Sequence, residues 1–281
     1  MKRYLIFLFI LSGMALGGCD SDQDYLIRIE TRHGEMVGIL YDDTPIHKKN
    51  FIELAQSGRF DSTEFQRVMK GFMIQGGDVF TKENLPPQEW PTLEQEIRTN
   101  HIHKRGAMGA PRQPDPVNPR KESNGSQFYI VDGRDYTELE VTTDTQALQK
   151  AILKYMELGS QAQLRSEYSR LYEEGKFDSL TALVVSKREE IESFLNVNLS
   201  KDYTKEQIKD YTTMGGSAHL DREYTVFGEI LSGFEVIDQI ASESVNSNNR
   251  PFDPVYMKVS VEKVSKKKIQ QDYNYTYPDG N

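Results

Sequence analysis

Apolar and polar residues alternate along several short stretches of the chain, with the period of two that is typical of β-strands. Residues 25–30 and 35–41 are predicted as two strands, joined into a hairpin by a turn at His33-Gly34. Residues 126–131 and 255–264 alternate in the same way. The pattern therefore predicts a mainly β protein.

Two segments beside these strands carry helical spacing instead. The first begins at Thr44-Pro45, with threonine as the N-cap and proline at the first helical position, and ends at Gly58. The second covers residues 234–240. Their predicted buried stripes are Phe51, Leu54 and Ala55 in the first, and Val236, Ile237 and Ile240 in the second.

The composition changes over residues 136–212, where charges are dense and proline is absent. Apolar residues recur there at helical spacing. The predicted stripes are Leu148, Ile152 and Tyr155; Leu164, Tyr168, Leu171 and Tyr172; and Leu180, Leu183, Val184, Ile191 and Leu195. A capping box at 204–207 opens a further helix. We interpret the region as an α-helical insertion whose stripes pack internally; a groove for a partner stays open as the alternative.

The histidines do not predict a metal site. His33 and His47 are isolated in the sequence, and we expect both to face solvent. His101 and His103 stand at alternate positions, but no cysteine or histidine–carboxylate cluster lies near them in the sequence. No metal and no other cofactor is predicted.

The first residues have the pattern of a targeting segment. Lys2 and Arg3 precede an apolar run over 4–11 that is too short to span a bilayer. Leu16 and the small residues Gly17 and Gly18 then precede the only cysteine, Cys19. This arrangement resembles a bacterial lipobox, which implies a signal peptide over 1–18, lipidation of Cys19, a tether over 19–24 and a lipid-anchored protein of the cell envelope, facing the periplasm or the cell surface. A plain secretory signal or a buried core cysteine remains the alternative.

Length and charge narrow the classes of partner. The 281 residues, 37% of them hydrophobic, can bury a sizeable core. A net charge of -9 argues against non-specific binding to nucleic acid, which favours basic surfaces. We expect a monomer without a nucleic-acid partner.

One run, residues 65–78 with the sequence F-Q-R-V-M-K-G-F-M-I-Q-G-G-D, carries the candidate chemistry. It places Arg67 among β-forming and large apolar residues, close to the amide of Gln75. A guanidinium beside an apolar surface suits an apolar ligand that has one polar bond. Taken alone, the run fits equally well an arginine on the wet face of a half-buried strand.

The order of residues in this run resembles the signature of the cyclophilins, F-H-R-V-I-x-x-F-M-x-Q-G-G-D. The sequence G-S-Q-F-Y at 125–129 resembles the family's G-S-Q-F-F, and H-L-D-R-E-Y-T-V-F-G at 219–228 resembles W-L-D-G-x-H-x-V-F-G. The resemblance covers residues 25–131 and 219–264. It implies peptidyl-prolyl cis-trans isomerase activity on proline-containing polypeptides.

The resemblance also implies a fold: a closed, eight-stranded antiparallel barrel capped by two helices. The barrel is expected in two parts, over 25–135 and 213–264, with the helical insertion between them. Residues 265–281, rich in lysine and then in tyrosine, are predicted as a flexible tail.

Site residues follow by position from the matched motifs. Arg67 is the implied catalytic residue. The implied substrate-binding residues are Gln66, Phe72, Met73, Gln75, Arg112, Gln127, Tyr129, His219, Leu220 and Tyr224. Four of them, Gln66, Tyr129, His219 and Tyr224, depart from the family's usual residue, and we expect them to alter ligand preference and to weaken cyclosporin binding. The alternative function is a non-catalytic proline-peptide-binding or chaperone-like module with the insertion as its client surface.

Overall fold

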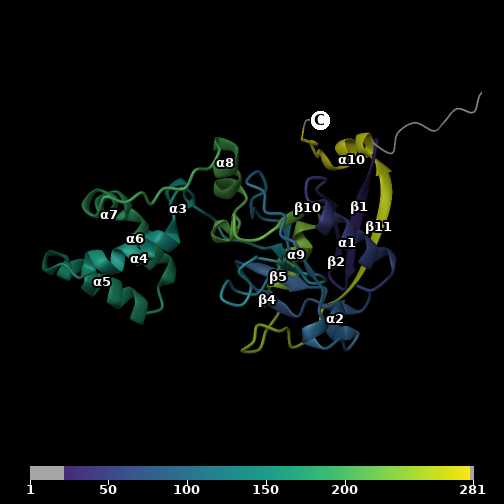
Figure 1. The fold of residues 1–281 in the computed structure, drawn as a ribbon, viewed down its shortest axis with the longest axis horizontal. Helices are drawn as coiled ribbons and strands as arrows, with labels where there is room; N and C mark the ends of the chain where they lie inside the picture. Colours follow the sequence, from purple (N-terminus) through teal and green to yellow (C-terminus); the bar gives the residue numbers. More distant parts are fainter. Residues whose placement is uncertain (1–21, 279–281) are drawn as a thin grey trace, which may run out of the picture.

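The computed structural model describes residues 22–278 (Figure 1). Within them the main feature is a curled antiparallel sheet of nine strands, in the order β3-β11-β1-β2-β10-β7-β9-β5-β4. The strands are β1 (Gln23–Thr31), β2 (Gly34–Leu40), β3 (Thr63–Glu64), β4 (Arg67–Met69), β5 (Met73–Gly76), β7 (Ala107–Gly109), β9 (Phe128–Val131), β10 (Val226–Ser232) and β11 (Tyr256–Ser265). A separate two-stranded sheet pairs β6 (Thr92–Leu93) with β8 (Ser123–Asn124).

The sheet differs from the closed eight-stranded barrel that was expected. Among the described residues it has nine strands, and its ladder is open between β3 and β4. These two end strands are separated in the chain only by Phe65 and Gln66. Beyond this break, the Val68 N–H donates to the carbonyl of Asn249 at 2.8 Å, so a loop pairs with β4 in place of a neighbouring strand.

Two helices cover the core of the sheet, as predicted. Helix α1 (Pro45–Gln56) packs against β10 and β11, and α9 (Phe234–Ala241) packs against β2, β4 and β5. Thr44 precedes α1, but its side chain does not cap the helix and donates to the Tyr41 carbonyl instead. The predicted stripes of both helices are buried, in a core that also contains Phe60, Phe65, Phe128 and Phe227.

The expectation that His47 faces solvent is wrong. Its side chain is 2% exposed, and its Nδ1 lies 2.7 Å from Glu96 Oε2. Its Nε2 lies 2.9 Å from the Ser123 hydroxyl. His47 therefore ties α1 to the segments around β6 and β8, through partners that are distant in the sequence.

The helical insertion lies to one side of the sheet, with α8 nearest to it (Figure 1). Its helices are α3 (Glu138–Val141), α4 (Thr145–Met156), α5 (Ala162–Glu173), α6 (Phe177–Ser186), α7 (Arg188–Leu195) and α8 (Lys205–Thr213). The predicted stripe residues Leu148, Ile152 and Ile191 are fully buried in a core of its own. Thr204 forms the predicted capping box with Gln207. After the insertion the chain rejoins the sheet region at Gly216, which forms isolated β-bridges with Lys104 and Arg134.

Short helices complete the described structure. They are α2 (Val79–Lys82), the 3-10 turns η2 (Pro87–Glu89), η3 (Gly159–Gln161) and η4 (Ala218–Leu220), and α10 (Lys266–Tyr273). No helix among residues 22–278 is long and apolar enough to cross a membrane.

The segment predicted as a flexible tail contains α10, which packs beside β1 and β11 (Figure 1). The Ser265 side chain accepts a hydrogen bond from the Lys268 N–H and so caps the helix. Ile269 is fully buried with Leu26 and Val264, and Tyr275 and Tyr277 pack on the same cluster. The buried Ile269 and the tyrosines that follow it therefore dock the segment on the sheet.

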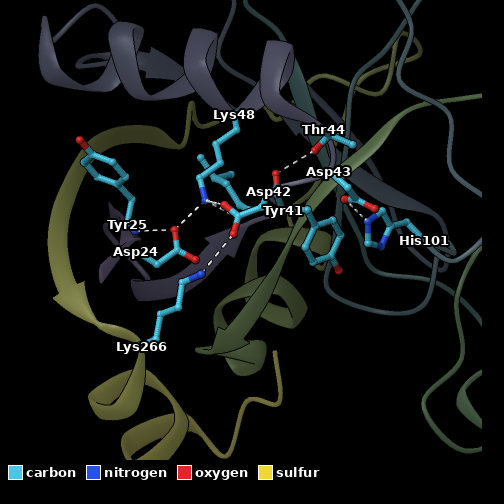
Figure 2. Close-up of polar contacts among 10 residues, drawn as sticks. Asp24, Tyr25, Tyr41, Asp42, Asp43, Thr44, Lys48, His101 and Lys266 are labelled. Atoms are coloured by element: carbon cyan, nitrogen blue, oxygen red, sulfur yellow. Dashed lines mark hydrogen bonds and ion pairs between the residues drawn. The ribbon is translucent and has the colours of Figure 1, made fainter. Parts of the chain in front are cut away.

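Ion pairs fasten the same end of the sheet (Figure 2). Lys48 on α1 reaches both Asp24 and Asp42 at 2.6 Å. Lys266 approaches Asp42 at 3.4 Å. These contacts join the first strand, α1 and the C-terminal helix. The predicted signal peptide and Cys19 lie outside the described residues.

Candidate active site

Arg67 lies on β4, directly opposite Gln75 on β5. Its Nη1 donates to Gln75 Oε1 at 3.3 Å, and its Nη2 lies 3.2 Å from Met69 Sδ. The side chain is exposed, and no carboxylate among residues 22–278 forms an ion pair with it. A guanidinium has five N–H donors. Most of them are therefore available to a ligand.

Three glutamines continue from Arg67 along the sheet. The Gln75 amide donates to Gln127 Oε1 at 2.7 Å, and the Gln66 amide donates to the same oxygen at 3.3 Å. The Gln127 amide nitrogen keeps no protein partner within the described residues. Gln66 Oε1 is buried without a partner there, which costs about 1–3 kcal/mol. The site thus offers one unpaired donor, the Gln127 amide, beside the cation.

An apolar cluster lies next to these polar groups. Met73, Tyr129 and Leu220 are among its buried members, and Phe72 and Tyr224 are among the residues that pack against them. A side chain at Gly109 would overlap the ring of Tyr129, so the close approach of this ring to the strand requires glycine at that position. All five apolar residues predicted from the motifs are brought together.

A buried polar chain behind the cluster was missed by the sequence analysis. Tyr129 Oη lies 2.8 Å from His103 Nε2, and His103 Nδ1 lies 2.7 Å from Asp221 Oδ1. The other Asp221 oxygen, Oδ2, accepts hydrogen bonds from the hydroxyls of Tyr211 at 2.6 Å and Tyr203 at 2.8 Å. The chain links the site to helix α8 of the insertion.

The protonation of this chain follows from its contacts. Burial opposes the charge on Asp221, but the hydrogen bonds from His103 and Tyr211 prevail and lower its pKa. An ionised Asp221 holds a proton on His103 Nδ1; when the imidazole is neutral, the Tyr129 hydroxyl then donates to Nε2. Burial also raises the pKa of Tyr129 well above its usual value. The Tyr129 hydroxyl is thus engaged by His103, and its ring packs in the apolar cluster.

Known proteins share most of this architecture. The sequence model of the family described as cyclophilin type peptidyl-prolyl cis-trans isomerase/CLD matches residues 26–145 and 196–261, more than half of the chain. The chain belongs to the cyclophilin family. It is a peptidyl-prolyl cis-trans isomerase of the cyclophilin type. The unmatched stretch, 146–195, coincides with helices α4 to α7.

Relatives of this cyclophilin include bacterial proteins of similar design. It is 26% identical over 234 residues to a protein of Streptococcus pyogenes serotype M6 assigned as a bifunctional phosphatase/peptidyl-prolyl cis-trans isomerase; the match covers 82% of this chain but only 37% of that one. It is 24% identical over 245 residues to an assigned peptidyl-prolyl cis-trans isomerase of Staphylococcus haemolyticus, covering 86% and 93% of the two chains.

A solved structure shares the fold. A cyclophilin type peptidyl-prolyl cis-trans isomerase of Cryptosporidium parvum superposes with a TM-score of 0.50 at 18% identity. The match covers 85% of this chain and 98% of that one. It therefore supports the architecture alone.

Arg112 lines the hollow that also contains Gln75 and Gln127, but its guanidinium is held by neighbouring residues of the chain. Its side chain is only 5% exposed and pairs with Glu223 at 3.0 Å and with Asp115 at 2.6 Å. Its guanidinium carbon also lies 4.7 Å from the centre of the Tyr224 ring. Because its donors are engaged, Arg112 supports Tyr224 instead of offering an open hydrogen-bonding group to a peptide.

One hollow, of about 960 Å³, flanks the cyclophilin site and is lined by Gln75, Gln127 and Arg112 together with Trp90 and Val117. The exposed His219 packs against Phe72 with ring centroids 5.2 Å apart. No group of histidine, cysteine and carboxylate side chains able to hold a metal occurs in the described part of the chain.

We expect the Tyr129→Phe variant to keep kcat/KM for a short Xaa-Pro peptide close to the wild-type value. The ring surface stays, but His103 Nε2 loses its buried donor, so the free energy of unfolding should fall by about 1–2 kcal/mol. Urea denaturation and the peptide assay measure the two effects, with Tyr172→Phe, an exposed tyrosine, as the control. A loss of turnover without a loss of stability would instead place the hydroxyl in contact with the substrate.

Proposed function

We propose that this cyclophilin accelerates Xaa-Pro rotation by placing the Arg67 guanidinium against the proline nitrogen. Amide resonance sets a barrier of about 18–20 kcal/mol to this rotation. In the twisted state the nitrogen becomes pyramidal and gains a lone pair that accepts a hydrogen bond. A donor that binds this state better than the planar ground state lowers the barrier.

One observation carries the proposal: Arg67 is an exposed cation without a carboxylate partner in the described chain, at the edge of an apolar cluster. Gln75 holds the guanidinium from one side and leaves its other donors open. The cluster of Phe72, Met73 and Leu220 suits an apolar ring such as proline. The deciding test is isomerisation of a short Xaa-Pro peptide by the wild type and by variants at Arg67.

The remaining site groups fit a peptide carbonyl beside the proline. The Gln127 amide supplies a donor for this carbonyl, and a peptide carbonyl needs a donor when it leaves water. Gln66, whose own oxygen is buried, donates its amide to Gln127 and so holds it in place. These two glutamines are therefore proposed to orient the substrate backbone so that its Xaa-Pro bond faces Arg67.

The substrates are proposed to be unfolded or folding proteins of the cell envelope, met by an enzyme held there through a lipidated Cys19. Support for the anchor comes from the basic start, the short apolar run and the small residues before the only cysteine. Two or more acyl chains on one residue give stable attachment, whereas one gives only marginal binding.

In a bacterial host the wild type is expected to incorporate labelled palmitate and to need detergent for extraction from membranes. The Cys19→Ser variant should do neither, because the sulfur that receives the lipid is gone. Ser21→Ala, two residues away, serves as the matched control. Equal labelling of the wild type and Cys19→Ser would refute lipidation at this cysteine.

A further inference from the structure

The helical insertion has an apolar groove of about 300 Å³ between α4, α5 and α6. Its lining includes the buried Leu148, Leu180 and Val185. Two aromatic side chains of the lining, Tyr172 and Phe177, remain 61% and 60% exposed, and their rings meet edge to face with centroids 6.1 Å apart. Large exposed aromatic residues grouped around a hollow are typical of a binding surface.

This groove lies next to a second hollow that reaches toward the isomerase site. The second hollow, of about 190 Å³, shares Thr145 and Thr181 with the groove and extends to His219. His219 in turn packs against Phe72 of the apolar cluster. Adjoining hollows therefore lead from the proposed proline site past His219 to the groove.

The second hollow is more polar than the apolar cluster on one side of it and the groove on the other. It is lined by charged and hydroxyl side chains, which include Arg134, Glu140, Lys201 and Thr143. Such groups can bind the carbonyl and N–H groups of an extended backbone, whereas the apolar groove suits side chains. The polar hollow and the apolar groove together suit one polypeptide that extends from the proposed proline site to the insertion.

We propose that the groove binds apolar or aromatic side chains of the same polypeptide whose proline occupies the site at Arg67. The inference rests on the proposed function and names a second recognition element for its substrate. At about 300 Å³ the groove is at the small end of ligand pockets, which suits one or two side chains. Because both contacts belong to one chain, the second becomes intramolecular and strengthens binding without a new partner.

The test compares a short Xaa-Pro peptide with longer peptides in which a Phe-Leu pair stands at increasing distance from the proline, on either side. Each longer peptide has a counterpart with Ser-Ser in place of Phe-Leu. The wild type is expected to show kcat/KM about tenfold higher, and Kd about tenfold lower, for the best Phe-Leu peptide than for its counterpart. The short peptide sets the basal rate.

The groove variant is Tyr172→Ser with Phe177→Ser, two changes at exposed positions. It should lose the tenfold preference and keep the wild-type rate on the short peptide. The matched control is Leu153→Ser with Phe194→Ser, which are 52% and 57% exposed and do not line the groove. The control should keep both the preference and the basal rate.

Equal kcat/KM and Kd for all Phe-Leu and Ser-Ser pairs would overturn the inference. So would a self-association of the wild type that the groove variant abolishes, since a second copy would then be the occupant. Kd, measured by fluorescence anisotropy, does not depend on turnover. A failure of the wild type to isomerise the short peptide would therefore count against the proposed function alone, while the binding preference still decides the groove.

Discussion

Arg67→Ala is expected to lower kcat/KM for a short Xaa-Pro peptide by about 10²–10³-fold, the usual loss when a donor to a developing charge is removed. In the proposed mechanism the guanidinium acts on the twisted state far more than on the planar one. The loss should therefore fall mainly on kcat, with KM changed less. A protease-free assay of cis–trans relaxation, at peptide concentrations above and below KM, separates the two.

Stability should not change in this variant, because Arg67 is exposed and forms only one long hydrogen bond to Gln75 and one contact with Met69. Arg120→Ala, an exposed arginine that pairs with Glu122, is the matched control and should keep full activity. Arg67→Lys should restore part of the rate, since a lysine keeps the charge but not the planar array of donors. Wild-type rates for Arg67→Ala would reject the proposed role of the guanidinium.

Much of the candidate site could be predicted because its residues stand in three ordered motifs. Arg67, Gln75 and the apolar Phe72 and Met73 come from one hairpin, so their spacing in the chain is also their spacing in space. Gln127 followed in the same way from the second motif, G-S-Q-F-Y at 125–129. Short-range order of this kind can be recognised in a single sequence.

The polar chain behind the site could not be predicted in this way. His103 and Asp221 are 118 positions apart, and His47 and Glu96 are 49 apart. No local period links such residues; only the folded sheet brings them together. The alternate histidines at 101 and 103 were a visible signal, but they suggested a metal question and not a buried histidine–aspartate pair.

The fold differs from its prediction at two places, the break between β3 and β4 and the segment after Ser265. The break at Phe65–Gln66 contains neither glycine nor proline, the residues that usually signal an interruption in the sequence. The docked segment after Ser265 did have signals, a capping serine and the single apolar Ile269. The lysines around these two residues gave the segment the composition of a flexible tail, and the prediction followed that composition.

The buried hydrogen-bonded chain of Tyr129, His103 and Asp221 makes Asp221→Asn the variant with the largest expected loss of stability. The carboxylate is 3% exposed and accepts four hydrogen bonds, two from His103 and one each from Tyr211 and Tyr203. Breaking one partner of a buried charged network costs about 3–5 kcal/mol. Because the amide keeps one acceptor oxygen, we expect a loss at the lower end of that range.

Urea denaturation measures this loss. Fluorescence of Trp90, the only tryptophan, reports on the part of the chain that contains the sheet, and circular dichroism reports on the helices. The control is Asp202→Asn, an exposed aspartate next to Tyr203 in the sequence. The pKa of Asp221 is lowered in the folded state, so its charge stabilises the fold fully above the unfolded value of about 3.9. That contribution is lost as the pH falls through the lower folded value. The difference between wild type and Asp221→Asn should therefore be largest near neutral pH and shrink below about pH 4; a difference that stays constant into acid would show that shape, and not charge, makes this aspartate necessary.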